Sequence, residues 1–566
     1  MILRTALVVV MAMSVLLAGC APKEVVNEVT RVVTEKVVET VMVEGTPQVV
    51  EREVTRVVEV EKVVTPTIEL APPQKKTLIY VYPQEVRWLD PAKITEGMSG
   101  TVARNVYSRL LDRSYDGYQT FPDLAETWEV SDDGLTYTFH LRAGVKFHDD
   151  TPLTAADVVY SFQRALAINL GDVPFVIGKL SPDSVVALDD LTVQMTLSEA
   201  WSAFPTIIAG PFSFSILPRA WVEANATAAD PWAEEYLKDH ANGTGPFEFV
   251  EWVPQQYVRM VRYDEYWKGP AKIEEVLYQL SPDDTTSRLA LEKGDVDVVM
   301  ILPDDMMTVL KQNPNIHVYT KPVASYMYWI FDTSAAPFND KRVRQAFAYA
   351  LDYDSMMENL VKDGGTRMNS PLMSGMFGHN PKLPLIQRDV EKAKQLLAEA
   401  GYPAGFAMDM PYVVWGLIPD LAVVIQANLA DIGVQARLQE ITLNALMGGV
   451  EDGSLPFFVW NSSPVYPHPD AMFQKLISAN MGMGLEGNLA SYSNPELDAA
   501  VEQARVAVSE EDQLAAYYRA QEIVMDDMPW LLLYEESQSR ATGSWVIGYD
   551  FGSFNRDNFW NLDIQR

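Results

Sequence analysis

Pairs of neighbouring carboxylates are the residues in this sequence that most readily suggest chemistry. Asp132-Asp133 and Asp149-Asp150 could hold calcium or serve as acid and base. Neither pair is followed by EF-hand spacing, so we interpret both as solvated turn residues. The sequence also lacks a GxSxG motif, an HExxH motif and an SxxK motif with its partners. Two acids far apart in the sequence could still converge as in a glycosidase, so a secreted hydrolase of polysaccharides or peptides is one alternative.

Phosphate and metal chemistry have little support in the residue pattern. The run Gly243-Thr244-Gly245-Pro246-Phe247 predicts a tight turn, and it lacks the Lys-Ser/Thr pair of a P-loop. One cysteine and six scattered histidines, none in an HxxxH or HxxH pair, form no metal-ligand pattern. We therefore expect neither a cofactor nor a metal.

Residues 457–470 are the best candidate for a binding surface. A hydrophobic run leads into Trp460 and then into a polar, proline-rich loop, and loops that follow buried strands commonly carry binding residues. Core packing is the alternative for Trp460, and a loop or helix-cap role is the alternative for Asp470. We interpret His468 as a solvent-facing loop residue. The candidate ligand contacts are Trp460, Asn461, Ser463, Tyr466 and Asp470, with Trp415 and Tyr107 as further aromatic candidates for which core packing is an equal alternative.

Length and charge limit the classes of function. The chain has 566 residues, which corresponds to about two to four structural units, and 48% of them are hydrophobic, enough for a large core. With 77 Asp and Glu against 44 Lys and Arg, the formal net charge is −33. This acidity argues against a nucleic-acid partner, because phosphates require a basic surface, and against electrostatic docking on anionic lipid.

The first twenty residues predict export and a lipid anchor. Arg4 precedes the apolar run Thr5–Leu17, which is too short to span a bilayer of about 30 Å but is typical of a signal peptide. Leu17-Ala18-Gly19-Cys20 resembles the bacterial lipobox, in which cleavage precedes a cysteine that becomes diacylglyceryl-modified. We predict a signal peptide over residues 1–19 and lipidation of Cys20. An ordinary secretory signal with a chance cysteine is the alternative.

Residues 20–76 are predicted to be a spacer. Glu28–Val33 recurs as Glu53–Val58 within a segment rich in Val, Glu and Thr. The valine positions do not distinguish a strand from a helix. We expect a mainly extended tether that could reach about 180 Å at roughly 3.3 Å per residue, with a short coiled coil as the alternative.

From Thr77 onward the sequence predicts a globular α/β protein. Thr77–Tyr82 has the composition of a buried strand. Residues 135–142 alternate between apolar and polar side chains, and the turn signal at 132–134 predicts a hairpin with residues 128–130. Helices are expected after three N-cap residues, which are Thr154, Asp389 and Asn494.

A series of motifs runs through this globular part. Residues 124–142 read LAETWEVSDDGLTYTFHLR, and residues 144–158 read GVKFHDDTPLTAADV. Further blocks follow in order: GTGPF at 243–247, YWKG at 266–269, PFNDKRVRQA at 337–346, AKQLLAEAGY at 393–402 and YSNPELD at 492–498. The series resembles the extracytoplasmic solute-binding proteins of the peptide/nickel class, often called family 5, over about residues 77–566. Asp150 stands where that family usually has glycine, and aspartate can adopt the left-handed conformation that such a turn needs.

The resemblance implies an α/β, two-lobed, periplasmic-binding-protein-like fold with hinge strands and an extra domain inserted in lobe I. The implied boundaries are 77–120, 241–325 and 529–566 for lobe I, 121–240 for the inserted domain and 326–528 for lobe II. The implied function is that of a non-enzymatic, lipid-anchored substrate-binding protein of an ABC importer, which delivers an oligopeptide or oligosaccharide to a membrane permease. We expect a monomer at the cell surface or in the periplasm. A solute sensor without a transporter is a further alternative.

One position departs from the peptide-binding members of this class. They typically place an aspartate about three residues after the tryptophan, where it pairs with the α-amine of the peptide. Ser463 occupies that position here, and a shift of two residues gives Val465. A buried ammonium group without a carboxylate is costly, so simple peptide binding would require Asp470 to substitute. A neutral, hydroxyl-rich oligosaccharide would suit the Trp, Asn and Ser side chains of this loop.

Overall fold

The computed structural model describes residues 31–43, 46–58, 76–114, 116–210, 212–480, 487–552 and 557–566. The chain divides into two compact units, Met1–Gln74 and Lys75–Arg566. The signal segment 1–19 and the predicted lipidation site Cys20 lie outside the described residues. Within the described ranges, every helix is too short or too polar to cross a bilayer.

The first unit contains a β-hairpin within the predicted tether. Strands β1 (Arg31–Val43) and β2 (Thr46–Val58) pair antiparallel, with Arg31 opposite Val58 and Val43 opposite Thr46. The repeated Val-rich sequences therefore lie in strands that pair with each other, as expected from the high β-propensity of Val and Thr. This part of the segment folds back on itself, so the fully extended reach does not apply to it, and these two ranges contain no helix for a coiled coil.

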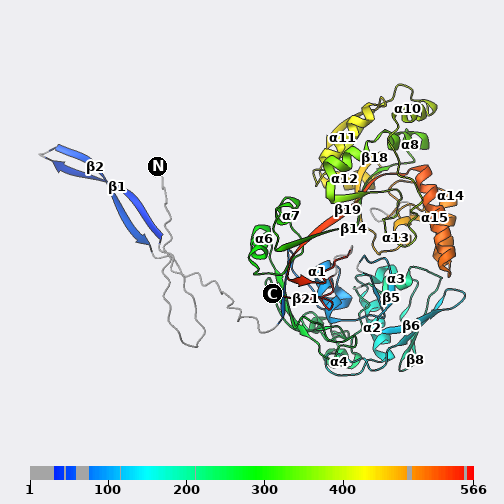
Figure 1. Cartoon of the computed structure of the whole chain (residues 1–566), viewed down its shortest axis with the longest axis horizontal. Coiled ribbons are helices and arrows are strands. Elements are labelled where there is room, and N and C mark those ends of the chain that lie inside the picture. The colour runs from blue at the N-terminus through cyan, green and yellow to red at the C-terminus, as the bar shows by residue number, and fades with distance from the viewer. Residues whose placement is uncertain are drawn as a thin grey trace. The chain divides into compact units, whose positions relative to one another are not determined.

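A nine-stranded mixed sheet forms the centre of the second unit (Figure 1). Its predicted buried strand, β3 (Thr77–Tyr82), is confirmed and pairs parallel with β12 and β13. The sheet order is β10-β11-β12-β3-β13-β19-β14-β18, and β15 pairs with β19. The other strands are β10 (Phe247–Val253), β11 (Tyr257–Arg262), β12 (Glu275–Leu280), β13 (Val298–Val299), β14 (Ile316–Phe331), β15 (Gly365–Arg367), β18 (Phe457–Ser462) and β19 (Trp530–Gly543).

Two long strands of this sheet run from one half of the unit to the other. Strands β14 and β19 pair antiparallel from Ile316 opposite Gly543 to Ile330 opposite Trp530. We call residues 326–528 lobe II, residues 121–240 the inserted segment, and the rest of 77–566 lobe I, and we call β14 and β19 the crossing strands. The mixed α/β class predicted from the sequence is confirmed.

The inserted segment has its own sheet and core. The predicted hairpin is confirmed as β6 and β7, and Thr154 and Asp157 form the predicted capping box of α2. Asp150 adopts φ 66°, the left-handed turn conformation expected of it. The core takes residues from Leu110 to Ile216, so it begins before position 121, and it also includes Tyr466 and Ala471 of lobe II. The elements are β4 (Leu111–Arg113), β5 (Thr120–Pro122), β6 (Ala125–Val130), β7 (Thr136–Leu141), α2 (Ala155–Ile168), β8 (Val185–Asp189), β9 (Thr192–Thr196) and α3 (Phe204–Ile208).

Lobe II is a mostly helical layer around strands β14, β18 and β19. Asp389 and Asn494 cap their helices through backbone N–H groups, as the sequence predicts. A second, two-stranded parallel sheet joins β16 to β17. The elements are α8 (Lys341–Ala350), α9 (Tyr353–Met356), α10 (Val390–Glu399), β16 (Ala407–Tyr412), α11 (Ile418–Ala430), β17 (Gln435–Glu440), α12 (Leu443–Glu451), α13 (Pro469–Phe473), α14 (Pro495–Val506) and α15 (Glu510–Asp527).

Lobe I packs a hydrophobic core on each face of the central sheet. The glycine-rich run is a site of close backbone approach, because a Cβ atom on Gly243 would lie 2.2 Å from the carbonyl oxygen of Val106. Helices α4 and α5 fall within 121–240 but contribute side chains to the lobe I core. The elements are α1 (Gly97–Val106), α4 (Arg219–Asn225), α5 (Glu234–Leu237), α6 (Asp284–Lys293), α7 (Asp304–Leu310), β20 (Val546–Ile547) and β21 (Asp563–Ile564).

A buried ion pair ties the C-terminal segment to a crossing strand. Arg540 of β19 and Asp557 are both about 1% exposed, and an Arg540 Nη1 to Asp557 Oδ1 distance of 2.5 Å joins them. Tyr80 and Tyr549 also donate hydrogen bonds to this carboxylate.

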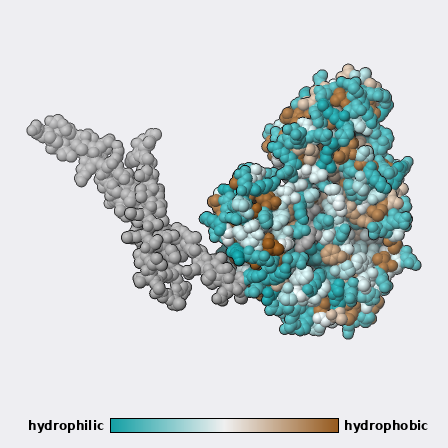
Figure 2. All heavy atoms as spheres, viewed as in Figure 1, coloured by the Kyte–Doolittle hydropathy of each residue, from teal (hydrophilic) through white to brown (hydrophobic). Residues whose placement is uncertain are grey.

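The face of the second unit shown in Figure 2 is mostly hydrophilic, with hydrophobic residues in small, separate patches.

Candidate functional site

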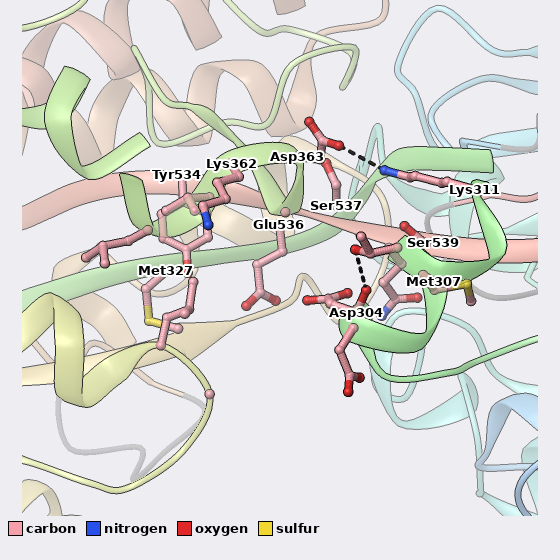
Figure 3. A pocket seen from close by; sticks show the side chains of 18 of the residues that line it. Asp304, Met307, Lys311, Met327, Lys362, Asp363, Tyr534, Glu536, Ser537 and Ser539 are labelled. Atoms are coloured by element: carbon pink, nitrogen blue, oxygen red, sulfur yellow. Dashed lines mark hydrogen bonds and ion pairs between the residues drawn. The ribbon is translucent and has the colours of Figure 1, made fainter. Parts of the chain in front are cut away.

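A cavity of about 580 Å³ lies where lobes I and II meet (Figure 3). Helix α7 and the turn to Lys311 form its lobe I wall, and residues 360–364 and 415–417 form its lobe II wall. The crossing strands form its floor with Met327, Tyr534 and residues 536–539. A volume of this size is within the range of small-molecule sites.

Strand alternation determines which side chains reach this floor. Tyr534 and Glu536 are two residues apart on β19 and therefore point to the same face, and Met327 of β14 is opposite Tyr534. The intervening Glu535 lines a different cavity and is 2% exposed. Its carboxylate accepts hydrogen bonds from the backbone N–H and the hydroxyl of Ser374, and burial raises its pKa above the usual value.

The cavity is acidic. Four carboxylates line it, from Asp304, Asp305, Asp363 and Glu536, against the two ammonium groups of Lys311 and Lys362, which leaves a formal charge of −2. Lys311 Nζ pairs with Asp363 at 2.8 Å. Glu536 is half-buried and accepts a hydrogen bond from Ser325 Oγ at 2.5 Å. Among the described residues, no cationic group lies within 4 Å of Asp304, Asp305 or Glu536.

Trp415 is the predicted candidate that lies at this cavity. It belongs to the turn between β16 and α11, its side chain is 61% exposed, and it lines the lobe II wall. An exposed indole beside a polar floor gives the cavity an aromatic surface on which a solute could stack. As a ligand contact, Trp415 stays a prediction.

Trp460, Asn461 and Ser463 lie at the end of β18 and do not line this cavity. Trp460 is half-buried against the lobe II core, with its ring centroid 6.3 Å from that of Phe458. Asn461 is linked to the cavity floor, because Ser325 Oγ lies 3.3 Å from its Oδ1 and also donates to Glu536. Ser463 is exposed. The roles of these three residues in binding stay predictions.

Tyr466 and Asp470 lie in a buried network on the other side of lobe II. Asp470 is fully buried; its Oδ1 pairs with Arg505 Nε at 2.5 Å, and its Oδ2 accepts hydrogen bonds from the Trp201 indole and the Tyr466 hydroxyl. Burial alone would raise the pKa of Asp470, but Arg505 and the hydrogen bonds hold it below the usual value. In this conformation the carboxylate is committed to its protein partners, and a ligand role for either residue stays a prediction.

His468 corrects one interpretation made from the sequence. The residue is 4% exposed rather than solvent-facing, and its Nδ1 accepts a hydrogen bond from the backbone N–H of Asp470 at the start of α13. Burial lowers the pKa of His468 to about 4. The proline-rich loop misled the interpretation, because here the loop packs against the inserted segment, whose core includes Tyr466 and Ala471.

Tyr107 lies in the core of lobe I. Its side chain is 2% exposed, its hydroxyl donates to the carbonyl oxygen of Leu89 at 3.1 Å, and burial raises its pKa.

Sequence reasoning missed three carboxylates that line the cavity, which are Glu536, Asp304 and Asp305. The signal for Glu536 was a charged residue that follows the apolar run at the start of β19, and the signal for the aspartates was their place soon after β13.

The family follows from comparison with known proteins. Residues 119–482 match the family described as bacterial extracellular solute-binding proteins, family 5 Middle. The chain is 31% identical to heme-binding protein A of Haemophilus influenzae over 511 residues, which cover 86% of this chain and 92% of the relative. The chain belongs to this family. Another member, the dipeptide-binding protein of Escherichia coli, is 27% identical over 519 residues, covering 87% of this chain and 95% of the relative.

Solved structures of family 5 proteins have the same fold. HbpA2 from Haemophilus parasuis superposes with a TM-score of 0.78 at 28% identity, covering 87% of this chain and all of that one. DppA from Helicobacter pylori, in complex with the peptide STSA, superposes with a TM-score of 0.65 at 26% identity, covering 87% and 98%. Family 5 proteins are extracytoplasmic binding proteins rather than enzymes. The family resemblance and the two-lobed fold expected from the sequence are therefore confirmed.

Proposed function

We propose that this protein is the lipid-anchored substrate-binding protein of an ABC importer, which captures a small peptide-type solute between its lobes and passes it to a permease. The single observation that carries the proposal is the cavity of about 580 Å³ between α7 and lobe II. Two relatives named as a dipeptide-binding protein and a peptide-bound DppA support the solute class. The lipidation of Cys20 is part of this proposal.

Closure of the lobes would supply the binding mechanism. The two walls of the cavity come from different lobes, whereas the floor comes from strands that belong to both. A solute that touches both walls has more contacts when the lobes approach, so its binding free energy favours the closed state. The protein would then present a different shape to the permease with and without solute.

An oligosaccharide is the second solute class. The exposed indole of Trp415 faces a cavity that also contains the hydroxyl groups of Ser537 and Ser539, a combination suited to stacking and hydrogen bonding with sugar rings. An oligosaccharide is neutral, so the acidic lining of the cavity does not repel it.

Native mass spectrometry of the purified mature protein tests the proposed function. The protein would be titrated with a pool of tripeptides and with a ladder of β-linked oligosaccharides. We expect one bound solute per chain, recovered intact, and a rise in melting temperature, since solute at 100 times its Kd adds about 2.7 kcal/mol to the free energy of unfolding. Hydrolysis of the solute, or no retention of either class, would contradict the proposal. Metabolic labelling with a fatty acid, with Cys20→Ser as the control, tests the anchor separately.

A further inference from the structure

A cluster of buried arginines lies where lobe I meets the core of the inserted segment. Arg104 belongs to α1, Arg109 follows that helix, and Arg113 is the last residue of β4. Arg104 Nη2 lies 3.2 Å from Asp112 Oδ2, and Arg109 Nη2 lies 3.1 Å from Asp112 Oδ1. Two guanidinium groups therefore flank one carboxylate. Among the described residues, no other carboxylate lies within 4 Å of either group.

One carboxylate cannot neutralise both guanidinium groups. Burial alone would raise the pKa of Asp112, but Arg104 and Arg109 hold it below the usual value, so this carboxylate contributes one negative charge. The neighbouring acids have cations of their own. Asp123 pairs with Lys268 at 2.7 Å, and Asp172 is the acid that acts most strongly on Arg113.

The cluster around Asp112 therefore retains one positive charge in a chain whose formal net charge is −33. The side chain of Arg109 is 2% exposed and that of Arg104 is 9% exposed, so water screens this charge poorly. A buried charge without a partner is costly, and the cluster lacks an anion to balance it.

The hydrogen bonds of the cluster indicate the same deficit. Nε and Nη1 of Arg109 and Nε of Arg104 are buried donors that have no acceptor among the described residues. A buried donor without an acceptor costs free energy, which is why such groups are rare in folded proteins. The deficit is therefore one of both charge and acceptors.

Arg164 shows how a buried arginine in this protein is otherwise satisfied. Its side chain is 1% exposed, and its Nη1 and Nη2 donate to the two oxygens of Asp90 at 2.7 and 2.6 Å. Its Nε donates to the carbonyl oxygen of Trp232 at 2.9 Å. Compared with Arg164, Arg109 lacks a carboxylate of its own and two acceptors.

We infer that Arg104 and Arg109 bind a small inorganic anion of the size of chloride. Such an ion accepts several hydrogen bonds and carries the missing charge, whereas a water molecule would accept hydrogen bonds and leave the charge unbalanced. The burial of both guanidinium groups favours a small ion over an organic anion. The ion would connect the end of α1 to the start of the inserted segment.

The anion site goes beyond the proposed function because it needs no solute. Neither arginine lines the interlobe cavity. The ion would act on the stability of the junction between lobe I and the inserted segment, since anything that binds the folded chain in preference to the unfolded chain stabilises it.

Thermal unfolding of the full mature protein tests the inference, with chloride exchanged stepwise for the bulky anion gluconate at constant ionic strength. We expect the melting temperature to rise with chloride by about 1–3 °C and then to level off, as for a single saturable site. Bromide should act like chloride. Crystals grown in bromide should show an anomalous scattering peak beside Arg104 and Arg109.

Arg109→Met should abolish the response to chloride, because it removes the excess charge and two of the unpaired donors. Arg164→Met is the matched control, since it makes the same change at a buried arginine whose donors already have acceptors. This control should lower the melting temperature and keep the response to chloride. If either variant fails to fold, the titration and the bromide peak of the wild-type protein decide the question.

Four results would overturn the inference. The first is a melting temperature that is the same in chloride and gluconate, and the second is a rise that continues without levelling off, as a general salt effect would. The third is a full response in folded Arg109→Met or its equal loss in both variants. The fourth is bromide crystals with no anomalous peak at the cluster. None of these results bears on solute binding, so the proposed function would stand or fall separately.

Discussion

The indole N–H of Trp201 donates a hydrogen bond to Asp470 Oδ2 at 3.0 Å, and this bond joins the inserted segment to lobe II. Tyr466 of lobe II packs beside it, with its ring 6.2 Å from Trp201 and 5.3 Å from Phe175. The lobes therefore meet at the crossing strands and again at this buried contact. Any closing motion must either rotate about the second contact or break it.

Trp201→Phe tests the strength of that contact. The substitution keeps an aromatic ring but removes the donor to a charged acceptor, which costs about 1.5–3 kcal/mol of the free energy of unfolding. Denaturant unfolding measures the loss. The control is Trp128→Phe, since Trp128 packs on the same core and makes no hydrogen bond through its indole among the described residues. Equal losses in the two variants would show that ring size, not the hydrogen bond, matters.

Two histidines, the buried His468 and the half-buried His148, predict a pH-dependent stability. Burial lowers the pKa of both His148 and His468 to about 4, below the usual 6.5. As the pH falls below 6.5, the unfolded chain binds protons before the folded chain does, so stability should be full above pH 6.5 and decline down to pH 4. Each ring accounts for up to about 3 kcal/mol, and Glu535, with its raised pKa, acts in the opposite direction.

Unfolding by denaturant at several pH values checks this prediction. His468→Gln and His148→Gln should each reduce the loss of stability between pH 6.5 and pH 4, by similar amounts because the two pKa values are lowered equally. A slope that is unchanged in both variants would contradict the assignment and point to carboxylates instead.

Gly243→Ala should destabilise the fold without touching the cavity. Its Cβ would lie 2.2 Å from the Val106 carbonyl oxygen and 2.7 Å from a ring carbon of Tyr107, so the backbone after α1 must move. We expect a loss of about 1–3 kcal/mol, the usual cost of overpacking. Gly97→Ala is the control, because nothing lies within 4 Å of its Cβ at the first residue of α1. A neutral Gly243→Ala would mean that this close approach is easily relieved.

Trp415→Ala should weaken solute binding and leave folding unchanged. The side chain is 61% exposed, so its loss removes little buried area from the protein, but it removes the aromatic wall of the cavity. We expect a loss of about 1 kcal/mol in binding, or about fivefold in Kd by isothermal titration. Val414→Ala, at a neighbouring residue that is 68% exposed, should bind normally. Equal affinity of wild type and Trp415→Ala would place the solute elsewhere.

Local patterns were sufficient to predict much of the fold. The alternation of apolar and polar residues predicted β7, and the composition of Thr77–Tyr82 predicted β3. The N-cap residues Thr154, Asp389 and Asn494 predicted where α2, α10 and α14 begin. These features depend on residues within a few positions of each other, which is why one sequence suffices to find them. The glycines at 243–245 were assigned to a turn, whereas their main constraint is a backbone about 140 residues earlier in the chain.

The site was less accessible to sequence reasoning because its parts are distant. Asp304 and Glu536 line one cavity although 232 residues (536 − 304) separate them in the sequence, and Asp470 is paired with Trp201, 269 residues away. No local pattern reports such pairings. The composition of the loop around Trp460 suggests a binding surface, but its link to the cavity floor is the contact of Asn461 with Ser325, which also donates to Glu536.

The position of β19 in the central sheet has a consequence for how the molecule is made. This strand lies between β13 and β14, yet it begins at Trp530, near the end of the chain. During synthesis, β13 and β14 therefore emerge long before the strand that must be inserted between them, and the Asp557 partner of Arg540 comes later still. The central sheet therefore stays incomplete until translation is almost finished, and the nascent chain stays incompletely folded until then.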